Sequence, residues 1–156
     1  MIFHASIPAD DPEHVAAVLA EIWQGQAFRF PPWPGGCVAM AGDERNTTIE
    51  VYPRANTIAP GDGESQAQPL VDPQPSRHGC FHLAVATERS ADEILAIGAR
   101  EGWRAVRLSR GGLFEVIELW IENALLVEVM TAEMQADYRS RAKIGVWRQP
   151  IAPVAA

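Results

Sequence analysis

The chain has 156 residues, 47% of them hydrophobic, and a formal net charge of -7. This length can bury a proper core, either as one domain or as two small fused halves. The acidic balance and the scattered Lys and Arg side chains argue against nucleic acid or an anionic membrane surface as a partner, because both attract clustered positive charge.

Cysteine usage and the start of the chain bear on the compartment. Only Cys37 and Cys80 are present, so neither a disulfide framework nor a four-cysteine zinc site can be drawn. The first residues do not form a basic leader followed by an apolar segment, and no run of about 18 apolar residues occurs. We therefore expect a cytoplasmic protein without a membrane span.

The first half of the chain predicts a strand, a helix and three further strands. Asp10, Asp11 and Pro12 form an acidic cap with proline in the first helical turn. The apolar residues that follow recur three and four positions apart and predict one buried helical stripe: Val15, Val18, Leu19, Ile22 and Trp23. The predicted strands are 2–8, 27–30, 37–41 and 47–52, with a hairpin turn at 42–46.

A segment rich in proline and glycine separates this half from the next. It runs from 53 to 77 and has too little apolar content to form a layer of its own. We expect it to be an extended or mobile connector between the halves.

The second half repeats the order of the first at an offset of 78 positions, as from His4 to His82. Ser90 and Glu93 form a capping-box pattern at the start of its helix, and Gly102 ends that helix. The strands that follow are predicted at 104–108, 114–121 and 125–130, with a turn at 109–112. The organisation is thus a first βαβββ module over 1–52, the connector over 53–77, a second module over 78–130, and a C-terminal helix (132–143) and fraying tail within 131–156, the modules forming one functional domain.

Four polar residues interrupt the apolar runs at matched places in the two halves. His4 and Glu50 are 46 positions apart, and so are His82 and Glu128. An imidazole or a carboxylate in an apolar strand is costly unless something pairs with it. A lone His is more often a hydrogen-bonded core residue and a lone Glu marks a solvent face, but repetition at equal spacing favours a shared metal ion.

This ligand set has a definite chemistry. Two imidazoles and two carboxylates suit Ni, Co, Mn, Fe or Zn, and four protein ligands leave two positions of an octahedron open. A substrate chelating through neighbouring oxygens would be polarised there, which stabilises developing negative charge in the transition state. A glutamate that leaves the metal could then move a proton between adjacent carbons.

With this order of elements and these residues, the sequence resembles the vicinal-oxygen-chelate superfamily, which includes glyoxalase I, bleomycin-resistance proteins, fosfomycin-modifying enzymes and extradiol dioxygenases. The resemblance covers 2–130 and implies an α+β fold: two tandem βαβββ modules with mixed curved sheets forming a cleft, plus a C-terminal helix. In the glyoxalase I branch, the first strand of each module supplies a His and the last a Glu. The resemblance therefore implies a divalent metal on His4, Glu50, His82 and Glu128, with Glu128 as the proton-transferring residue and Glu50 as its partner.

Departures from the glyoxalase I pattern count against a glutathione hemithioacetal as the substrate. Members of that branch place an Arg four residues after the first His and an Asn four after the first Glu, and both hold the glutathione part. Pro8 and Arg54 stand at these positions here. The usual Asp-Pro-Asp-Gly turn before the last strand is replaced by Ile-Glu-Asn-Ala at 121–124.

Several other polar and aromatic residues leave alternatives open. Glu118 and Trp120 share one face of their strand and Glu115 and Ile117 the other, so either pair could point inward. The turn at 109–112 does not match a phosphate-binding loop. Trp33, Tyr52 and Trp120 could shape an aromatic pocket, although core packing explains most such residues.

Three functions follow as hypotheses. The first is a glyoxalase-like metal-dependent lyase or isomerase acting on a small substrate that chelates the metal through neighbouring oxygens. The alternatives are a non-catalytic small-molecule-binding protein of bleomycin-resistance type and a ferrous dioxygenase of extradiol type, which would use two His and one Glu. The resemblance also implies a homodimer, in which a site takes its ligands from one chain or from both.

Overall fold

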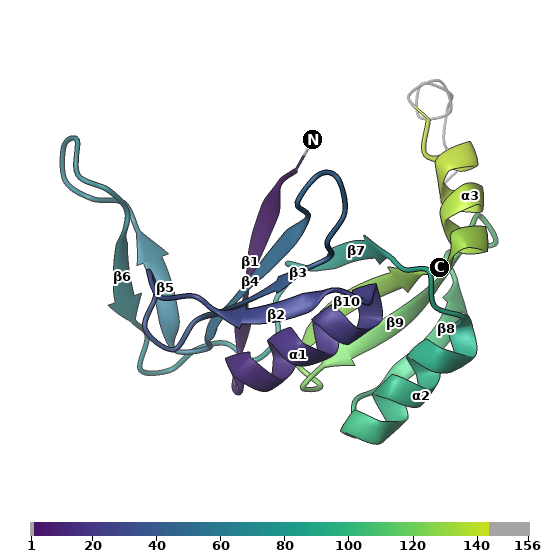
Figure 1. Ribbon diagram of the computed structural model, residues 1–156, viewed down its shortest axis with the longest axis horizontal. Coiled ribbons are helices and arrows are strands. Elements are labelled where there is room, and N and C mark those ends of the chain that lie inside the picture. Colours follow the sequence, from purple (N-terminus) through teal and green to yellow (C-terminus); the bar gives the residue numbers. More distant parts are fainter. Residues whose placement is uncertain (1, 144–156) are drawn as a thin grey trace. The chain divides into compact units, whose positions relative to one another are not determined.

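The order of strand, helix and three strands occurs twice in the structure, a computed structural model that describes residues 2–143 (Figure 1). The chain divides into a first unit, Met1–Cys80, and a second unit, Phe81–Ala156, and each is described by itself. The elements of the first unit are β1 (His4–Ala9), α1 (Pro12–Trp23), β2 (Gln26–Arg29), β3 (Cys37–Met40), β4 (Thr48–Pro53), β5 (Asn56–Ala59) and β6 (Gln68–Val71). Those of the second unit are β7 (Leu83–Ala86), α2 (Ala91–Glu101), β8 (Ala105–Ser109), β9 (Glu115–Ile121), β10 (Leu125–Met130) and α3 (Ala132–Arg141).

Both units contain a four-stranded mixed sheet with the same topology. The strand order is β1-β4-β3-β2 in the first unit and β7-β10-β9-β8 in the second. In each sheet the first and last strands of the module pair in parallel, and the other neighbours are antiparallel. The α+β fold class, with two tandem βαβββ modules and a C-terminal helix, is therefore confirmed.

Local capping signals position the two long helices. The Asp11 carboxylate accepts a hydrogen bond from the backbone N–H of His14 at 3.0 Å, and Pro12 occupies the first turn of α1. Ser90 and Glu93 form the predicted capping box at the start of α2. The left-handed residue that follows α2 is Gly102, as predicted, and the left-handed residue that follows α1 is Gln24.

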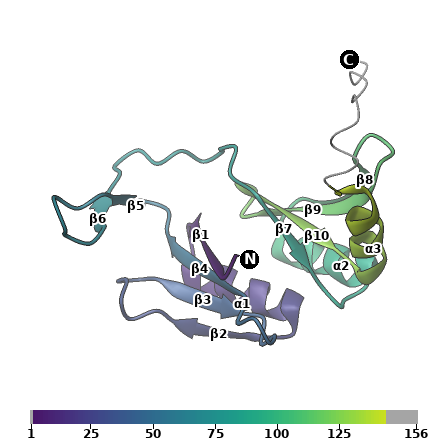
Figure 2. The same cartoon turned by 90° about the horizontal axis from the view of Figure 1, so that it is seen from above.

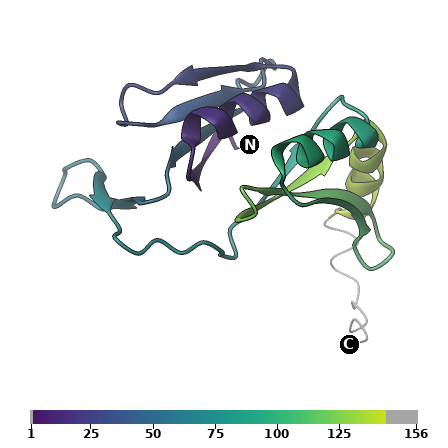
Figure 3. The same cartoon turned by 90° about the horizontal axis from the view of Figure 1, so that it is seen from below.

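One helix covers one face of each sheet. Figures 2 and 3 show α1 lying along the first sheet and α2 along the second. The strand residues that face these helices are the fully buried ones, such as Ile7 and Val51 in the first unit and Leu119 and Val127 in the second. Because strand side chains alternate, the residues between them lie on the face opposite the helix. The candidate polar residues lie on that opposite face.

The two sheets differ in the register of one strand. Glu50 pairs with Val38 in the first sheet, but Glu128 pairs with Glu118 in the second, so the third strand is displaced by two residues between the halves. The shorter turn before β10 accounts for this displacement, because three residues separate the paired Ile121 and Leu125, whereas seven separate the paired Met40 and Thr48. Within the shorter turn, Glu122 and Asn123 both adopt left-handed φ values, 51° and 52°. The displacement places an extra carboxylate beside Glu128.

The connector contains structure that the sequence did not predict. Two short strands, β5 and β6, pair antiparallel inside the segment predicted to be extended or mobile. Their β-prone residues, Thr57 and Ile58 on one side and Leu70 and Val71 on the other, are few, and the surrounding proline and glycine obscured them. A hairpin of this size is marginal alone. Arg54, shortly before β5, donates its backbone N–H to Ala9 O at 2.8 Å, which extends the pairing of β1 with β4 up to the start of the hairpin.

The C-terminal helix was predicted over 132–143 and extends over Ala132–Arg141. The tail from Pro150 to Ala156, predicted to fray, lies outside the described residues. Within residues 2–143, no helix combines the length and hydropathy that a membrane span would need.

Replacing Gly98 by alanine is expected to destabilise the protein by about 1 to 2 kcal/mol, since overpacking outweighs the gain in helix propensity. A Cβ at Gly98 would lie 2.4 Å from the Cβ of Ala105, so α2 and β8 would have to separate. Urea unfolding of Gly98→Ala measures the loss. Gly79→Ala is the control, because its methyl group meets no atom of the described residues within 4 Å. A Gly98→Ala protein as stable as the parent would contradict the packing.

Candidate functional site

The first unit brings His4 and Glu50 together. His4 begins β1 and Glu50 lies in β4, and the parallel pairing sets Ser6 opposite Glu50, two residues beyond His4. The distance from His4 Nε2 to Glu50 Oε2 is 3.9 Å, with the His4 side chain 58% exposed and that of Glu50 15% exposed. The half-buried carboxylate and the exposed imidazole are therefore neighbours in the first unit.

Two neutral hydroxyls fix the Glu50 carboxylate. Ser6 Oγ donates a hydrogen bond to Glu50 Oε2 at 2.8 Å, and Tyr52 Oη donates to the same oxygen at 2.6 Å. Among the described residues, the other oxygen, Oε1, has no hydrogen-bond partner. Glu50 is thus oriented by its Oε2 atom while Oε1 is left for another partner.

Tyr52 is a donor that keeps its proton well above neutral pH. Burial, together with the hydrogen bond to Glu50, raises the pKa of Tyr52 to about 12. Its ring stacks on Trp33, with centroids 4.7 Å apart and planes 21° from parallel, and lies 6.2 Å from the ring of Phe30. Two members of the suggested aromatic pocket, Trp33 and Tyr52, are therefore in contact, while Trp120 belongs to the second unit.

A pocket adjoins the hydroxyls that hold Glu50. Its volume is about 370 Å³, and Ser6 and Tyr52 line it together with Pro8, Arg54 and residues of the connector hairpin. Ligand pockets in proteins begin at roughly this size. A pocket of about 570 Å³ lies between the start of α1 and the proline-rich corner around Trp33, but none of His4, Ser6 or Glu50 lines it. The smaller pocket is therefore the candidate for ligand binding.

Asp10 ties both ends of the connector to the first unit. Arg54 Nε lies 2.6 Å from Asp10 Oδ1, and Arg77 Nη1 lies 2.9 Å from Asp10 Oδ2. The hydrogen bond from Arg54 is the main reason that the pKa of Asp10 is lowered from its usual value. Arg54, which the resemblance aligns with a substrate-holding Asn, is 9% exposed and serves as a structural partner of Asp10.

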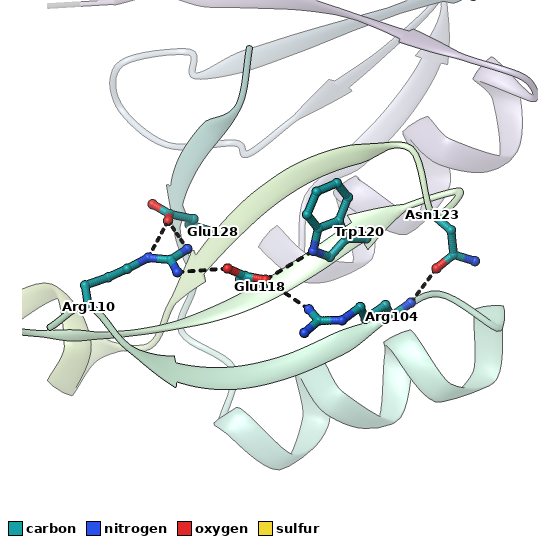
Figure 4. A network of polar contacts seen from close by, with 6 residues as sticks. All are labelled: Arg104, Arg110, Glu118, Trp120, Asn123 and Glu128. Atoms are coloured by element: carbon teal, nitrogen blue, oxygen red, sulfur yellow. Dashed lines mark hydrogen bonds and ion pairs between the residues drawn. The ribbon is translucent and has the colours of Figure 1, made fainter. Parts of the chain in front are cut away.

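In the second unit, Glu128 binds an arginine. Arg110 Nε donates to Glu128 Oε1 at 2.9 Å, and Nη2 of the same guanidinium donates to the same oxygen (Figure 4). His82 directly precedes β7, which begins at Leu83, so the second predicted histidine lies one residue outside the strand. Glu128 pairs with Ala84 as Glu50 pairs with Ser6, so the backbone positions of the two glutamates are equivalent.

Arg110 connects two carboxylates that would otherwise repel each other. Glu118 and Glu128 face each other across the antiparallel pair of β9 and β10, an arrangement that destabilises a sheet when the charges are alike. Arg110 Nη1 lies 2.8 Å from Glu118 Oε1, so the guanidinium bridges both groups. Glu118 also accepts hydrogen bonds from Arg104 Nη1 at 2.9 Å and Trp120 Nε1 at 3.2 Å. Of the two pairs that could have pointed this way, Glu118 and Trp120 therefore lie on the same face of the second sheet as Glu128.

Arg110 is the site residue that the sequence did not reveal. It precedes Gly111 and Gly112, both left-handed with φ of 60° and 74°, in the predicted turn between β8 and β9. The turn was recognised from its glycines. Arg110 becomes a site residue only because the strand register sets Glu118 opposite Glu128. The sequence carries no direct signal for that register.

The four predicted metal ligands can be compared with the arrangement of side chains in each unit. In the part of the chain that the structure describes, no three His, Cys, Asp or Glu side chains gather in a group able to hold a metal ion. Each unit supplies one His and one Glu of the predicted four. The 3.9 Å distance in the first unit joins His4 Nε2 to Glu50 Oε2, the oxygen that Ser6 and Tyr52 hold. The first unit therefore brings one His and one Glu of the predicted four close together.

Alkaline pH is expected to destabilise the protein through Tyr52. A raised pKa means that the folded state holds the proton more tightly, so this stabilisation is complete below the unfolded pKa of about 10 and is lost as the pH rises towards the folded value. The loss is about 2 kcal/mol. Chemical unfolding of the parent and Tyr52→Phe at pH 9 and above measures it. In Tyr138→Phe, where Tyr52 is the one remaining tyrosine, ultraviolet absorbance of tyrosinate rising at ordinary pH would contradict the assignment.

Acid pH is expected to destabilise the protein through Glu118. Burial opposes its charged form, but hydrogen bonds from Arg110, Trp120 and Arg104 together hold the pKa of Glu118 below its usual value. A lowered pKa gives a stabilisation that is present above the unfolded value of about 4.3 and is lost as the pH falls through the folded value. Unfolding free energies from pH 7 to pH 3 should therefore fall less steeply in Glu118→Gln than in the parent. Parallel curves would show that the network has no such role.

Comparison of the sequence with protein-family models gives no match, and comparison with curated proteins gives none either. Solved structures do match. The fosfomycin resistance protein FosX from Mesorhizobium loti aligns with 87% of this chain and 95% of its own, at 10% identity and a TM-score of 0.52. A protein assigned to the glyoxalase family from Bacillus anthracis aligns over 84% and 93%, at 17% identity and a TM-score of 0.53.

Lactoylglutathione lyase from Agrobacterium tumefaciens gives a similar result. It aligns over 85% of this chain and 94% of its own, at 12% identity and a TM-score of 0.52. At such identities the likeness establishes the fold and not an activity. The chain has the fold of the vicinal-oxygen-chelate superfamily, as the sequence resemblance predicted.

Proposed function

We propose that the protein is a glyoxalase-like metal-dependent lyase or isomerase whose small substrate chelates a divalent cation through neighbouring oxygens. The observation that carries this proposal is the His4 and Glu50 pair, 3.9 Å apart, whose neighbours Ser6 and Tyr52 line a pocket of about 370 Å³. Ser6 and Tyr52 fix the Glu50 carboxylate from behind, as the outer partners of metal ligands do. Such support is unnecessary for a glutamate that merely marks a solvent face.

The proposed ligands are His4, Glu50, His82 and Glu128. Each unit contributes one histidine and one glutamate, and the equivalent pairing of Ser6 with Glu50 and of Ala84 with Glu128 supports treating them as two halves of one site. The halves can come from one chain or from two copies, and a homodimer is part of the proposal. The nitrogen and oxygen donors suit Ni, Co, Mn, Fe or Zn.

The chain's own residues would hold and move a proton around this centre. A bound cation would act as a Lewis acid on the substrate oxygens. Tyr52 remains protonated at neutral pH and therefore stays a donor to Glu50 Oε2. Glu50 Oε1, which has no hydrogen-bond partner among the described residues, would then be the oxygen left to hold the cation or to accept a substrate proton. Glu128 is proposed as the group that transfers the proton between adjacent carbons, with Glu50 as its partner.

The pocket beside Glu50 favours a compact polar substrate. The residues that line it include the polar Ser6, Tyr52 and Asn56 and the apolar Pro8. Arg54 also lines it, but its guanidinium binds Asp10. This lining suits a molecule that is recognised through hydrogen bonds more than one recognised through a carboxylate.

A non-catalytic binding protein is the second candidate, and the ion pair between Arg110 and Glu128 favours it. A glutamate held by a guanidinium is a poorer cation ligand, so the site could bind a metabolite or drug without converting it. If the ion pair keeps Glu128 from binding a metal, the proposed ligands that remain are two His and one Glu, the set that an extradiol-type ferrous dioxygenase would use. Tight ligand binding by the metal-free protein would support the binding role, and oxygen uptake with catechols would support the dioxygenase.

Elemental analysis of protein purified without added metal tests the proposed centre. We expect about one divalent ion per set of four ligands, with most of it lost in His4→Ala and in Glu128→Ala. His14→Ala is the matched control, because His14 lies in α1 and outside the proposed set. Unchanged metal content in His4→Ala, or no metal in the parent even after incubation with Ni or Co, would reject the centre.

A further inference from the structure

We propose that the first unit has a second binding site, for a neutral and mainly apolar molecule that carries a carbonyl oxygen. The site is the pocket of about 570 Å³ between the start of α1 and the proline-rich corner, a volume within the range of small-molecule sites. Residues 11–13 and residues within 29–37 line it, and we call it the Trp33 pocket. It shares no lining residue with the pocket beside Glu50, and a ligand would bind there without a metal.

Backbone hydrogen bonds close the corner that forms part of the Trp33 pocket. Phe30 donates its N–H to Gly36 O at 2.9 Å, Trp33 donates to Phe30 O at 3.0 Å, and Gly36 donates to Trp33 O at 2.8 Å. Three prolines within 31–34 restrict the backbone further, and Gly35 takes the left-handed φ of 74° that favours glycine. The corner is therefore fixed before a ligand arrives, which lowers the entropic cost of binding.

The charged residues of the Trp33 pocket favour a neutral ligand over an ion. Glu13 Oε2 lies 3.7 Å from Arg29 Nη2, so these two exposed charges partly offset each other. The Asp11 carboxylate accepts a hydrogen bond from the backbone N–H of His14 in the cap of α1. Burial, together with the charge of Glu13, raises the pKa of the Cys37 thiol, which therefore stays neutral. Neither an anion nor a cation meets a field of one sign in this pocket.

Most of the other residues that line the Trp33 pocket carry rings. They are Pro12, Phe30, Pro31, Trp33 and Pro34. Flat apolar molecules pack well against aromatic rings, and removing their apolar surface from water favours binding. The pocket therefore suits a cyclic or aromatic skeleton.

A buried donor indicates which polar group the ligand carries. Trp33 Nε1 is buried and has no hydrogen-bond partner in the part of the chain that the structure describes. A buried N–H without an acceptor is costly, and native proteins supply almost all such groups with one. The stack on Tyr52, with ring centroids 4.7 Å apart, restrains the indole from turning towards another acceptor. A ligand packed against Trp33 can supply the acceptor.

A carbonyl oxygen meets both requirements, because it accepts a hydrogen bond without bringing a charge. A carboxylate would face Asp11 and Glu13, and an ammonium group has no acceptor to offer Trp33. The ligand class is therefore neutral cyclic or aromatic carbonyl compounds. Trp33 lines this pocket and Tyr52 lines the other, so the stacked rings join the walls of both.

Titration with acetophenone tests the site through the indole Nε1–H signals in the NMR spectrum of isotope-labelled protein. The chain has five tryptophans, and the signals of Trp33 and Trp120 are identified by their loss in Trp33→Phe and Trp120→Phe. Millimolar acetophenone should move the Trp33 signal downfield, as a new hydrogen bond does, and the movement should saturate. The Trp120 signal is the internal reference and should stay in place, because Trp120 Nε1 already donates to Glu118 at 3.2 Å.

Ethylbenzene is the matched control ligand, since a methylene group replaces the carbonyl group. It can enter the pocket but should not move the Trp33 signal downfield. Trp33→Phe keeps an aromatic ring and removes the donor, so its affinity for acetophenone should fall roughly tenfold more than its affinity for ethylbenzene. Parent-like positions of the remaining indole signals show that the variant is folded.

Three results would overturn the site. They are a Trp33 signal that acetophenone does not move, equal downfield movement with ethylbenzene, and an equal loss of affinity for the two ligands in Trp33→Phe. No metal takes part in any of these measurements, so the Trp33 pocket and the proposed metal centre can fail separately.

Discussion

The parallel pairing of the first and last strands of each module is the constraint on which the site depends. It brings together residues that are far apart in the sequence: β1 with β4, and β7 with β10. Parallel strands need a crossover connection, and the capped helix followed by two antiparallel strands supplies it. Because α1 and α2 cover one face, the polar residues of the paired strands fall on the other. The placement of Glu50 and Glu128 thus follows from the topology.

The same topology does not impose the same chemistry on the two halves. Glu50 has two hydroxyl partners, whereas Ala84 stands where Ser6 would be needed beside Glu128. Glu128 gains Glu118 and Arg110 because β9 is displaced by two residues relative to β3. The repeated backbone therefore carries two glutamates in unlike surroundings, one held by neutral hydroxyls and the other by a guanidinium.

Features set by neighbours in sequence were predictable, and those set by strand register were not. The Ser90 and Glu93 cap involves residues three apart, and the helix stripe repeats every turn, so the cap was predicted correctly, and the stripe also except for Trp23, which is only partly buried. Repetition of the His and Glu spacing indicated the equivalent strands and the fold. Arg110 escaped notice because its partners lie eight and 18 residues further along the chain, and only the pairing of β9 with β10 makes them neighbours. The connector hairpin was missed since its few β-prone residues were outweighed by proline.

The clamp formed by Asp10 has a consequence for how this chain can change. Arg54 and Arg77, which bind the two oxygens of that one carboxylate, mark the ends of the connector. The distance between these anchor points is set by a side chain of the first unit and not by the residues between them. Since the entropy of closing a loop grows slowly with its length, the tip between β5 and β6 can accept insertions or deletions while both anchor points stay where they are. Variation in length at this tip would leave the four-stranded sheet untouched, and also the wall of the pocket beside Tyr52, because no residue between β5 and β6 lines that pocket.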